Sequence, residues 1–275
     1  MGLLAGLSVA TAASLALNAS YVVQHGALAN AAPVRLAAPI ASVRGLLRSR
    51  RWVAGAVLAY GGIALNLVAM SLAPLWLVQT TIAAGLVVVC AAWAHISQRP
   101  LTGRERVAVG LVGAGLLVLA LAGAGGRPGV HPTALALAGC IATAAVLALA
   151  VVRRRGREQL GLAAGLLYGA TTVALASLPA AVAGGQIALV LVAILAGGSV
   201  TVAGFFAFQR GLQSGEAAPV VTQMTAGMNA ATITGGLLLG SGLAADWLPR
   251  AGQLAGLAAL CVAGALAAGG LTARR

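Results

Sequence analysis

The sequence predicts an all-α multi-span membrane protein with about nine transmembrane helices in two inverted-topology repeats. The apolar composition, the spacing of the arginines and a pair of similar Ala-Pro turns support this fold class. Of the 275 residues, 60% are hydrophobic and only 8% are charged, whereas soluble domains carry about 25% charged residues. Because a soluble protein of this length would need more polar surface, we expect a lipid bilayer to surround it.

Apolar runs define the predicted spans, since a transmembrane helix needs about 20 apolar residues. The runs lie near residues 2–24, 52–71, 74–94, 107–123, 132–152, 160–179, 186–208, 217–240 and 251–271. The segment 26–47 is rich in alanine but is interrupted by Arg35 and Arg44. It is either an amphipathic or re-entrant piece, or a tenth span that would move the N-terminus to the cytoplasmic side.

Arginines account for all 17 basic residues, and most of them lie in every second break between the runs. Those breaks and the tail hold Arg35, Arg44, Arg48, Arg50, Arg51, Arg99, Arg104, Arg106, Arg153, Arg154, Arg155, Arg157, Arg210, Arg274 and Arg275. Only Arg127 and Arg250 lie in the other breaks. Because cytoplasmic loops are enriched in arginine, we expect a multi-pass protein of the cell membrane with its C-terminus in the cytoplasm and its N-terminus outside.

The net charge of +13 does not indicate nucleic acid, because the arginines are placed at helix ends and not along a soluble face. Charge follows the first apolar run instead of preceding it, so we expect a retained anchor and not a cleaved signal peptide. The tryptophans fit this topology as interfacial aromatic belts, with Trp52 and Trp93 at the inner interface and Trp76 and Trp247 at the outer one.

Two short breaks have the same chemistry. Ala73-Pro74 opens a run that contains Gln79, and Ala218-Pro219 opens a run that contains Gln223. The prolines are 145 positions apart and lie on opposite sides of the predicted membrane. We therefore expect a first repeat over 1–124 with about four helices and a cytoplasmic arginine-rich loop at 25–51, a second over 132–271 with about five helices, and a cytoplasmic tail at 272–275. Inverted repeats are typical of secondary transporters that bind their substrate near the midplane.

Several segments resemble a known family. Arg51-Trp52 with Gly55 and the stretches 64–70 and 73–79 look like the first half of EamA-like members of the drug/metabolite transporter superfamily, and 110–119 resembles the glycine-rich last helix of that half. Gly211-Leu212 and the stretch 216–221 are similar to the family's equivalent turn in the second half. The family typically has five plus five spans, and a nine-span layout is similar to the NIPA-type magnesium transporter branch. The resemblance implies a secondary transporter.

Polar side chains inside apolar spans are the candidates for substrate binding, because each is costly in hydrocarbon. They are Asn18, Tyr21, Asn66, Gln79, Tyr168, Gln223 and Asn229. They either line a cavity that hydrogen-bonds a solute or hold neighbouring helices together. Taken as a group they favour the cavity.

Acidic residues are scarce, being limited to Glu105, Glu158, Glu216 and Asp246. Glu216 is either a proton-coupling carboxylate or a first-turn acid favoured by the helix dipole. Divalent cations bind through carboxylates, so magnesium is a less favoured substrate than a small neutral, zwitterionic or anionic metabolite. We expect no metal site and no cofactor.

The leading hypothesis is a drug/metabolite-type secondary transporter that works by alternating access. The alternative is a non-transporting membrane partner or a subunit that helps a lipid-linked intermediate across the bilayer, which would need a lateral opening with arginines at its rim. We do not expect an enzyme, because no catalytic constellation lies in or beside the spans. Among the small residues, we expect Gly161, Gly165 and Gly169 to pack within the molecule, and Gly252 and Gly256 leave a homodimer through the ninth helix open.

Overall fold

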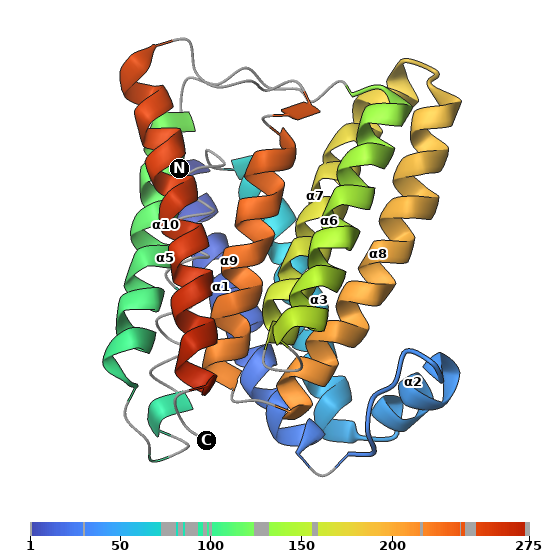
Figure 1. Cartoon of the computed structure of the whole chain (residues 1–275), viewed down its shortest axis with the longest axis vertical. Helices are drawn as coiled ribbons and strands as arrows, with labels where there is room; N and C mark the ends of the chain where they lie inside the picture. The colour runs from blue at the N-terminus through green and yellow to red at the C-terminus, as the bar shows by residue number, and fades with distance from the viewer. Residues whose placement is uncertain are drawn as a thin grey trace.

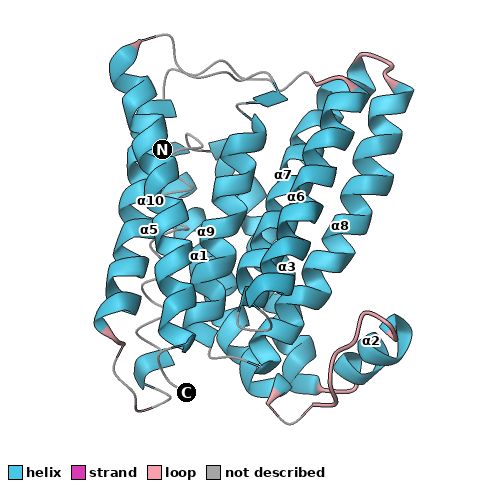
Figure 2. Ribbon diagram, viewed as in Figure 1, coloured by secondary structure: helices cyan, strands magenta, loops and turns pink. Residues whose placement is uncertain are grey.

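The computed structural model is a bundle of helices. It describes residues 2–29, 31–72, 81, 85, 93–95, 98, 101–123, 132–155, 159–214, 217–236, 238–239 and 246–272. No strand occurs among these residues (Figure 2). The all-helical part of the prediction is therefore confirmed.

The helices labelled in Figure 1 are α1 (Gly2–Leu28), α2 (Pro39–Leu47), α3 (Arg50–Leu72), α5 (Gly103–Gly123), α6 (Ala134–Arg155), α7 (Leu160–Ala183), α8 (Ile187–Ser214), α9 (Ala217–Gly236) and α10 (Trp247–Thr272). Within the described residues, 4 helices are long and apolar enough to cross a membrane, namely α1, α6, α7 and α8. The molecule is therefore a membrane protein. The predicted span at 74–94 lies outside the described residues except for 81, 85, 93 and 94.

The long helices alternate in direction, so that arginine gathers at one end of the bundle. In Figure 1, α1, α6, α8 and α10 run toward the lower end, whereas α3, α5, α7 and α9 start there. We call this the arginine-rich end, because α3 begins with Arg50 and Arg51 and α6 ends with Arg153 to Arg155. Arg250, in the first turn of α10, belongs to the opposite end. This placement matches the alternation that the arginines predict.

The segment at 26–47 does not form a tenth span. Its helix, α2, has 9 residues and is about 13 Å long at 1.5 Å per residue, which is less than half of a bilayer core. It lies beside the lower end of α8, outside the main bundle (Figure 1). Only Leu46 of α2 is buried, and Ile40 and Leu47 are exposed.

Hydroxyl side chains fix where several helices start. Ser49 Oγ accepts the backbone N–H of Trp52 at 3.2 Å, and Thr133 Oγ1 accepts that of Ala136 at 3.2 Å. Thr102 and Glu105 form a reciprocal pair at the start of α5, in which Glu105 Oε2 accepts the N–H of Thr102 at 2.8 Å. This is a capping box, which gives Glu105 a structural role.

A row of glycines brings α7 against α9. A Cβ atom added at Gly161, Gly165 or Gly169 would collide with the carbonyl oxygens of Val220, Met224 and Met228, which repeat with the same spacing of four residues. Glycine is thus required for this close approach of two backbones. The predicted intramolecular packing of this row is confirmed.

Glycines also join α5 to α10. A Cβ at Gly256 would lie 2.8 Å from the carbonyl oxygen of Gly115, and one at Gly252 would lie 2.9 Å from Cβ of Ala122. The small-residue face of α10 is therefore occupied by α5 of the same chain. A homodimer through this face would have to displace α5, and it stays a prediction.

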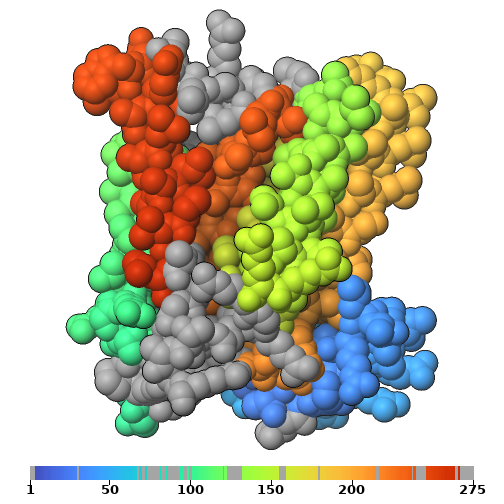
Figure 3. All heavy atoms as spheres, in the orientation of Figure 1, coloured from blue at the N-terminus to red at the C-terminus, as the bar shows by residue number. Residues whose placement is uncertain are grey.

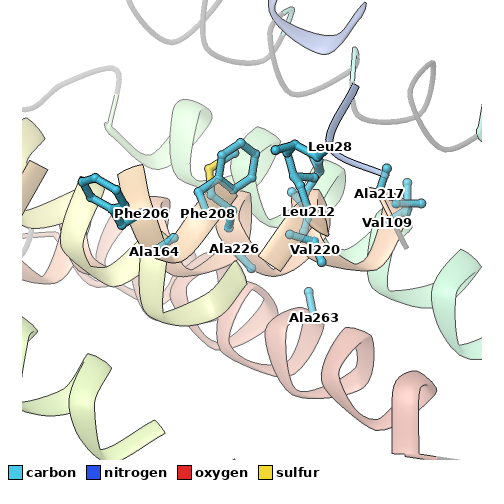
Figure 4. Close-up of a cluster of buried hydrophobic side chains, with 14 of the residues drawn as sticks. Leu28, Val109, Ala164, Phe206, Phe208, Leu212, Ala217, Val220, Ala226 and Ala263 are labelled. Atoms are coloured by element: carbon cyan, nitrogen blue, oxygen red, sulfur yellow. The ribbon is translucent and has the colours of Figure 1, made fainter. Parts of the chain in front are cut away.

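The main buried core includes side chains from both the first and the last helix of the chain. Figure 4 shows buried side chains from α1, α5, α7, α8, α9 and α10 converging on Phe208 and Leu212 of α8. A second buried cluster joins α6, α7 and the first part of α8. The first cluster positions the polar residues described next.

Candidate functional site

Two of the predicted binding residues are brought together by α8. The ring of Tyr21 on α1 lies 5.4 Å from the ring of Phe208, edge to face, and the ring of Tyr168 on α7 lies 6.4 Å from it. Edge-to-face pairs at these distances are favourable. Tyr21 and Tyr168 therefore both pack on Phe208, which lies six residues before the end of α8 at Ser214.

Next to these rings, three polar side chains form a hydrogen-bonded chain across α3, α8 and α1. Trp52 Nε1 donates to Gln209 Oε1 at 3.0 Å, and Gln209 Nε2 donates to Gln24 Oε1 at 2.8 Å. The exposed fractions of Trp52, Gln209 and Gln24 are 7%, 2% and 4%. Their polar groups thus satisfy one another away from water, as buried groups must. Trp52, expected in an interfacial belt, is instead a buried member of this chain.

His25 makes a further link between α1 and α8. Its Nδ1 lies 2.7 Å from the carbonyl oxygen of Leu212, so Nδ1 carries the hydrogen in this contact. The ring of Trp93 packs edge to face against the ring of His25 at 4.5 Å. The end of α1 is therefore tied to the last turns of α8.

Gln213 holds the segment that follows α1. Its Oε1 accepts the N–H of Val34 at 3.0 Å, and its Nε2 donates to the carbonyl oxygens of Ala31 at 2.9 Å and Ala32 at 3.0 Å. Val34 is buried by this arrangement. These hydrogen bonds link α1, α3 and α8 at the arginine-rich end of the bundle. We call the five residues that make them the closure, namely Gln24, His25, Trp52, Gln209 and Gln213.

Burial changes along α9. On α9, residues 217–224, 226 and 227 are buried, whereas 228–234 are half-buried or exposed. In Figure 3, α9 is seen in a hollow between α10 and α6. Asn229, a predicted binding residue, lies in this half-buried stretch, and its Nδ2 donates to the carbonyl oxygen of Thr225 at 2.8 Å. Thr232 reaches the carbonyl oxygen of Gly169 at 3.4 Å.

Asn66 on α3 carries the one buried side-chain oxygen or nitrogen that has no hydrogen-bond partner among the described residues, its Oδ1. An unpaired buried carbonyl costs roughly 1–3 kcal/mol, so the side chain of Asn66 is less well satisfied by the described structure than those of the other candidates. Asn18 on α1 is buried and donates to the carbonyl oxygen of Ser14 at 2.7 Å. Ser14 and Asn18 both lie against Gly85.

Gln223 is placed differently from the other candidates. Its side chain is 0% exposed, and its Oε1 accepts the N–H of Leu162 at 3.3 Å. That N–H is in the first turn of α7, where helices have no internal acceptor. The contact therefore joins α9 to α7, which favours the helix-linking alternative for Gln223, and its role in binding stays a prediction.

Gln79 and Glu216 lie outside the described residues. No group of three His, Cys, Asp or Glu side chains that could hold a metal ion is found within the described part of the chain. The site is thus built from amides, hydroxyls and aromatic rings, which suit hydrogen bonding to a solute without a net charge.

A groove of about 580 Å³ lies outside the bundle core, between α2 and α8. It is lined by Pro39, Ile40, Val43, Arg44, Leu47, Arg48, Val202 and Phe206. Most of its walls are apolar, and both of its charged residues are arginines.

Sequence reasoning missed Gln209, Gln213 and Phe208 as members of the site. The predicted span stopped at 208, but α8 continues to Ser214. The available signal was the periodicity, because Phe205, Gln209 and Leu212 share one helical face with spacings of four and three. Searches of family models, of curated proteins and of solved structures found no match to this chain.

Proposed function

We propose that this chain is a secondary transporter of the drug/metabolite type, which moves a small neutral, zwitterionic or anionic metabolite across the cell membrane by alternating access. The arginine-rich end and the C-terminus face the cytoplasm, and the N-terminus faces outside. The polar residues between the closure and the opposite end form the substrate site.

The observation that carries this proposal is the contrast along the bundle. Trp52, Gln209 and Gln24 tie α3, α8 and α1 together at the arginine-rich end, whereas α9 is half-exposed beyond residue 227. Asn66 offers a buried carbonyl without a partner among the described residues. Helices tied together at one end, with a half-exposed polar stretch toward the other, are what alternating access requires of one state in its cycle.

The packing supports two related halves. The two prolines are 145 residues apart. Adding 145 to the residue numbers of α5 gives 248–268, a range that falls within α10 (Trp247–Thr272). These two helices pack against each other and run in opposite directions (Figure 1). In the first half α1 contacts α3 and Gly85, and in the second half α7 contacts α8 and α9. These contacts support the proposal of two inverted halves, 1–124 and 132–271.

The chemistry of the candidate residues favours a solute without a net positive charge. Tyr21 and Tyr168 pack on the ring of Phe208, and Asn66 on α3 and Asn229 on α9 provide hydrogen-bond donors and acceptors. A cation would need a carboxylate to replace its hydration. The two described carboxylates, Glu105 and Asp246, are at the starts of α5 and α10.

Counterflow in liposomes tests this function. Labelled amino acids, sugars and organic phosphates are offered to liposomes that contain the purified protein. We expect saturable uptake of at least one compound from these three classes. Asn66→Ala should reduce that uptake by about tenfold, the loss for one hydrogen bond to a bound ligand. Thr143→Ala is the control, because Thr143 is exposed on α6 and bonds only to its own helix in the described structure.

Two outcomes would contradict the proposal separately. If none of the three classes enters faster than into empty liposomes, the transport function is wrong. If a substrate is transported and Asn66→Ala transports it as well as Thr143→Ala does, the site is wrong and the function stands.

One observation favours a second candidate, a subunit that helps a lipid-linked intermediate cross the bilayer. That function needs a lateral apolar opening with arginines at its rim, and the groove between α2 and α8 combines these features. The groove lies at the arginine-rich end only, however, and is separate from the polar residues of the core. Transport of a soluble metabolite therefore accounts for more of the site.

A further inference from the structure

One face of α2 forms a wall of the groove. Ile40, Val43, Arg44, Leu47 and Arg48 line it, and their spacing of three and four residues places them on one side of the helix. This face therefore combines a stripe of apolar side chains with two adjacent guanidinium groups. Short helices of this kind lie in the membrane interface with their apolar face toward the acyl chains.

The other wall continues into the outer surface of α8. Val202 and Phe206 line the groove, and Leu191, Leu195 and Val202 on the same helix are exposed. These residues are spaced by four and seven positions, so they form one apolar stripe along α8. An acyl chain lying on this stripe would meet one hydroxyl before the groove, that of Ser199, which is already bonded to the carbonyl oxygen of Leu195.

Local contacts fix the position of α2. Ser42 Oγ accepts the N–H of Arg35 at 3.0 Å and donates to its carbonyl oxygen at 3.1 Å, which closes the loop before the helix. Gln213 of α8 holds the chain at Val34, and Leu46 is buried on the side of α2 away from the groove. In Figure 3, α2 lies directly below the lower part of α8. The groove is thus a built feature at the arginine-rich end.

The two arginines of the groove favour an occupant with negative charge. Neither α2 nor α8 contains an acidic residue, so nothing on these helices neutralises Arg44 and Arg48. Guanidinium groups bind phosphate oxygens in a planar, bidentate manner. A phosphate diester held by two arginines, with apolar walls below it, is the head and upper chain of a phospholipid.

We propose that the groove between α2 and α8 binds one anionic phospholipid, with its phosphate on Arg44 and Arg48 and an acyl chain along Val43, Leu47 and Val202. A soluble anion would leave the apolar walls uncovered. A lipid with a choline headgroup would bring a cation next to the arginines.

Native mass spectrometry of the full chain in detergent tests this site with two probes that have the same chains, a phosphatidylglycerol and a phosphatidylcholine. We expect phosphatidylglycerol to remain bound more strongly, by about thirtyfold, since each of the two arginines near a charged lipid contributes roughly 1 kcal/mol. Arg44→Gln/Arg48→Gln should remove this preference. Val202→Trp should reduce the binding of both lipids by filling the groove while it keeps both charges.

The matched control is Arg153→Gln/Arg154→Gln, which removes the same charge at the same end of the bundle but on α6. It should leave the preference for phosphatidylglycerol intact. If this control loses the preference for phosphatidylglycerol to the same extent, the preference comes from the overall positive charge and not from the groove, and the proposal is wrong. Equal binding of the two lipids by the unmodified chain would also overturn the proposal. A dimer that Val202→Trp disrupts would show that a second copy occupies the groove. Unfolding temperatures of the variants exclude a folding defect as the cause.

Discussion

The two halves of α9 are similar in composition and differ in burial. From Ala217 to Gly227 nearly every side chain is buried, whereas from Met228 to Thr234 the chain is half-buried or exposed. The composition of the helix therefore does not decide its burial. Its main neighbours are α7 and α10, whereas the polar contacts at the arginine-rich end tie α1 to α3 and α8.

The largest expected effect comes from the glycine row of α7, which packs against both halves of α9. A leucine at Gly165 would collide with the carbonyl oxygen of Met224 and the backbone of Gly227, and a backbone cannot shift there without separating α7 from α9. We expect Gly165→Leu to abolish the yield of monodisperse protein in gel filtration.

Gly198→Leu is the control for this prediction. Gly198 is exposed on α8, and a Cβ there would meet nothing within 4 Å. If both variants fold equally well, the close contact between α7 and α9 is not what the structure describes.

The next effect concerns the closure itself. Gln209→Leu removes the acceptor of Trp52 Nε1 and the donor to Gln24 Oε1, so it leaves two buried polar groups unpaired at roughly 1–3 kcal/mol each. We expect a fall of several degrees in the temperature of thermal unfolding. Gln186→Leu makes the same change at the exposed position before α8 and should unfold as the unmodified chain does.

Cysteine labelling compares the two halves of α9 directly. In a chain without its natural cysteines, Ala226→Cys should resist a membrane-impermeant thiol reagent from both sides, because Ala226 is buried. Ala230→Cys, one turn further and half-buried, should be labelled from the side opposite the arginine-rich end. Adding Gln209→Leu should expose Ala226→Cys from the arginine-rich end. Equal labelling of both positions would contradict the contrast.

The helices, and the end of the bundle at which the arginines gather, could be predicted from the sequence because they depend on single segments. A run of apolar residues defines α7, and the arginines at the ends of α3 and α6 define the end at which they gather. The partner of a side chain depends on another segment, so it could not be predicted. Trp52 looks interfacial in its own segment, and only the proximity of Gln209 shows why it is buried.

The candidate site shows the same limit. Tyr21 and Tyr168 were identified as polar groups in apolar runs, and Phe208 brings them together. Gln223 has the same sequence signal, but it faces the first turn of α7 and pairs with the N–H of Leu162. Whether an intramembrane amide binds solute or another helix is decided by the rotation of its helix, which an apolar run does not specify.

The smallest expected effect lies between α7 and α8, away from the closure. Thr171 Oγ1 and Thr201 Oγ1 are 2.8 Å apart, and each hydroxyl also bonds within its own helix, Thr171 to Leu167 and Thr201 to Gly197. Because those local bonds remain available to either threonine alone, a double-mutant cycle with Thr171→Val and Thr201→Val should give a coupling of only about 0.6 kcal/mol, the average for such pairs in membranes. The cycle is measured by reversible unfolding in mixed micelles. A coupling as large as the loss in Gln209→Leu would mean that interhelical hydrogen bonds stabilise both ends alike, and the special role of the closure would be lost.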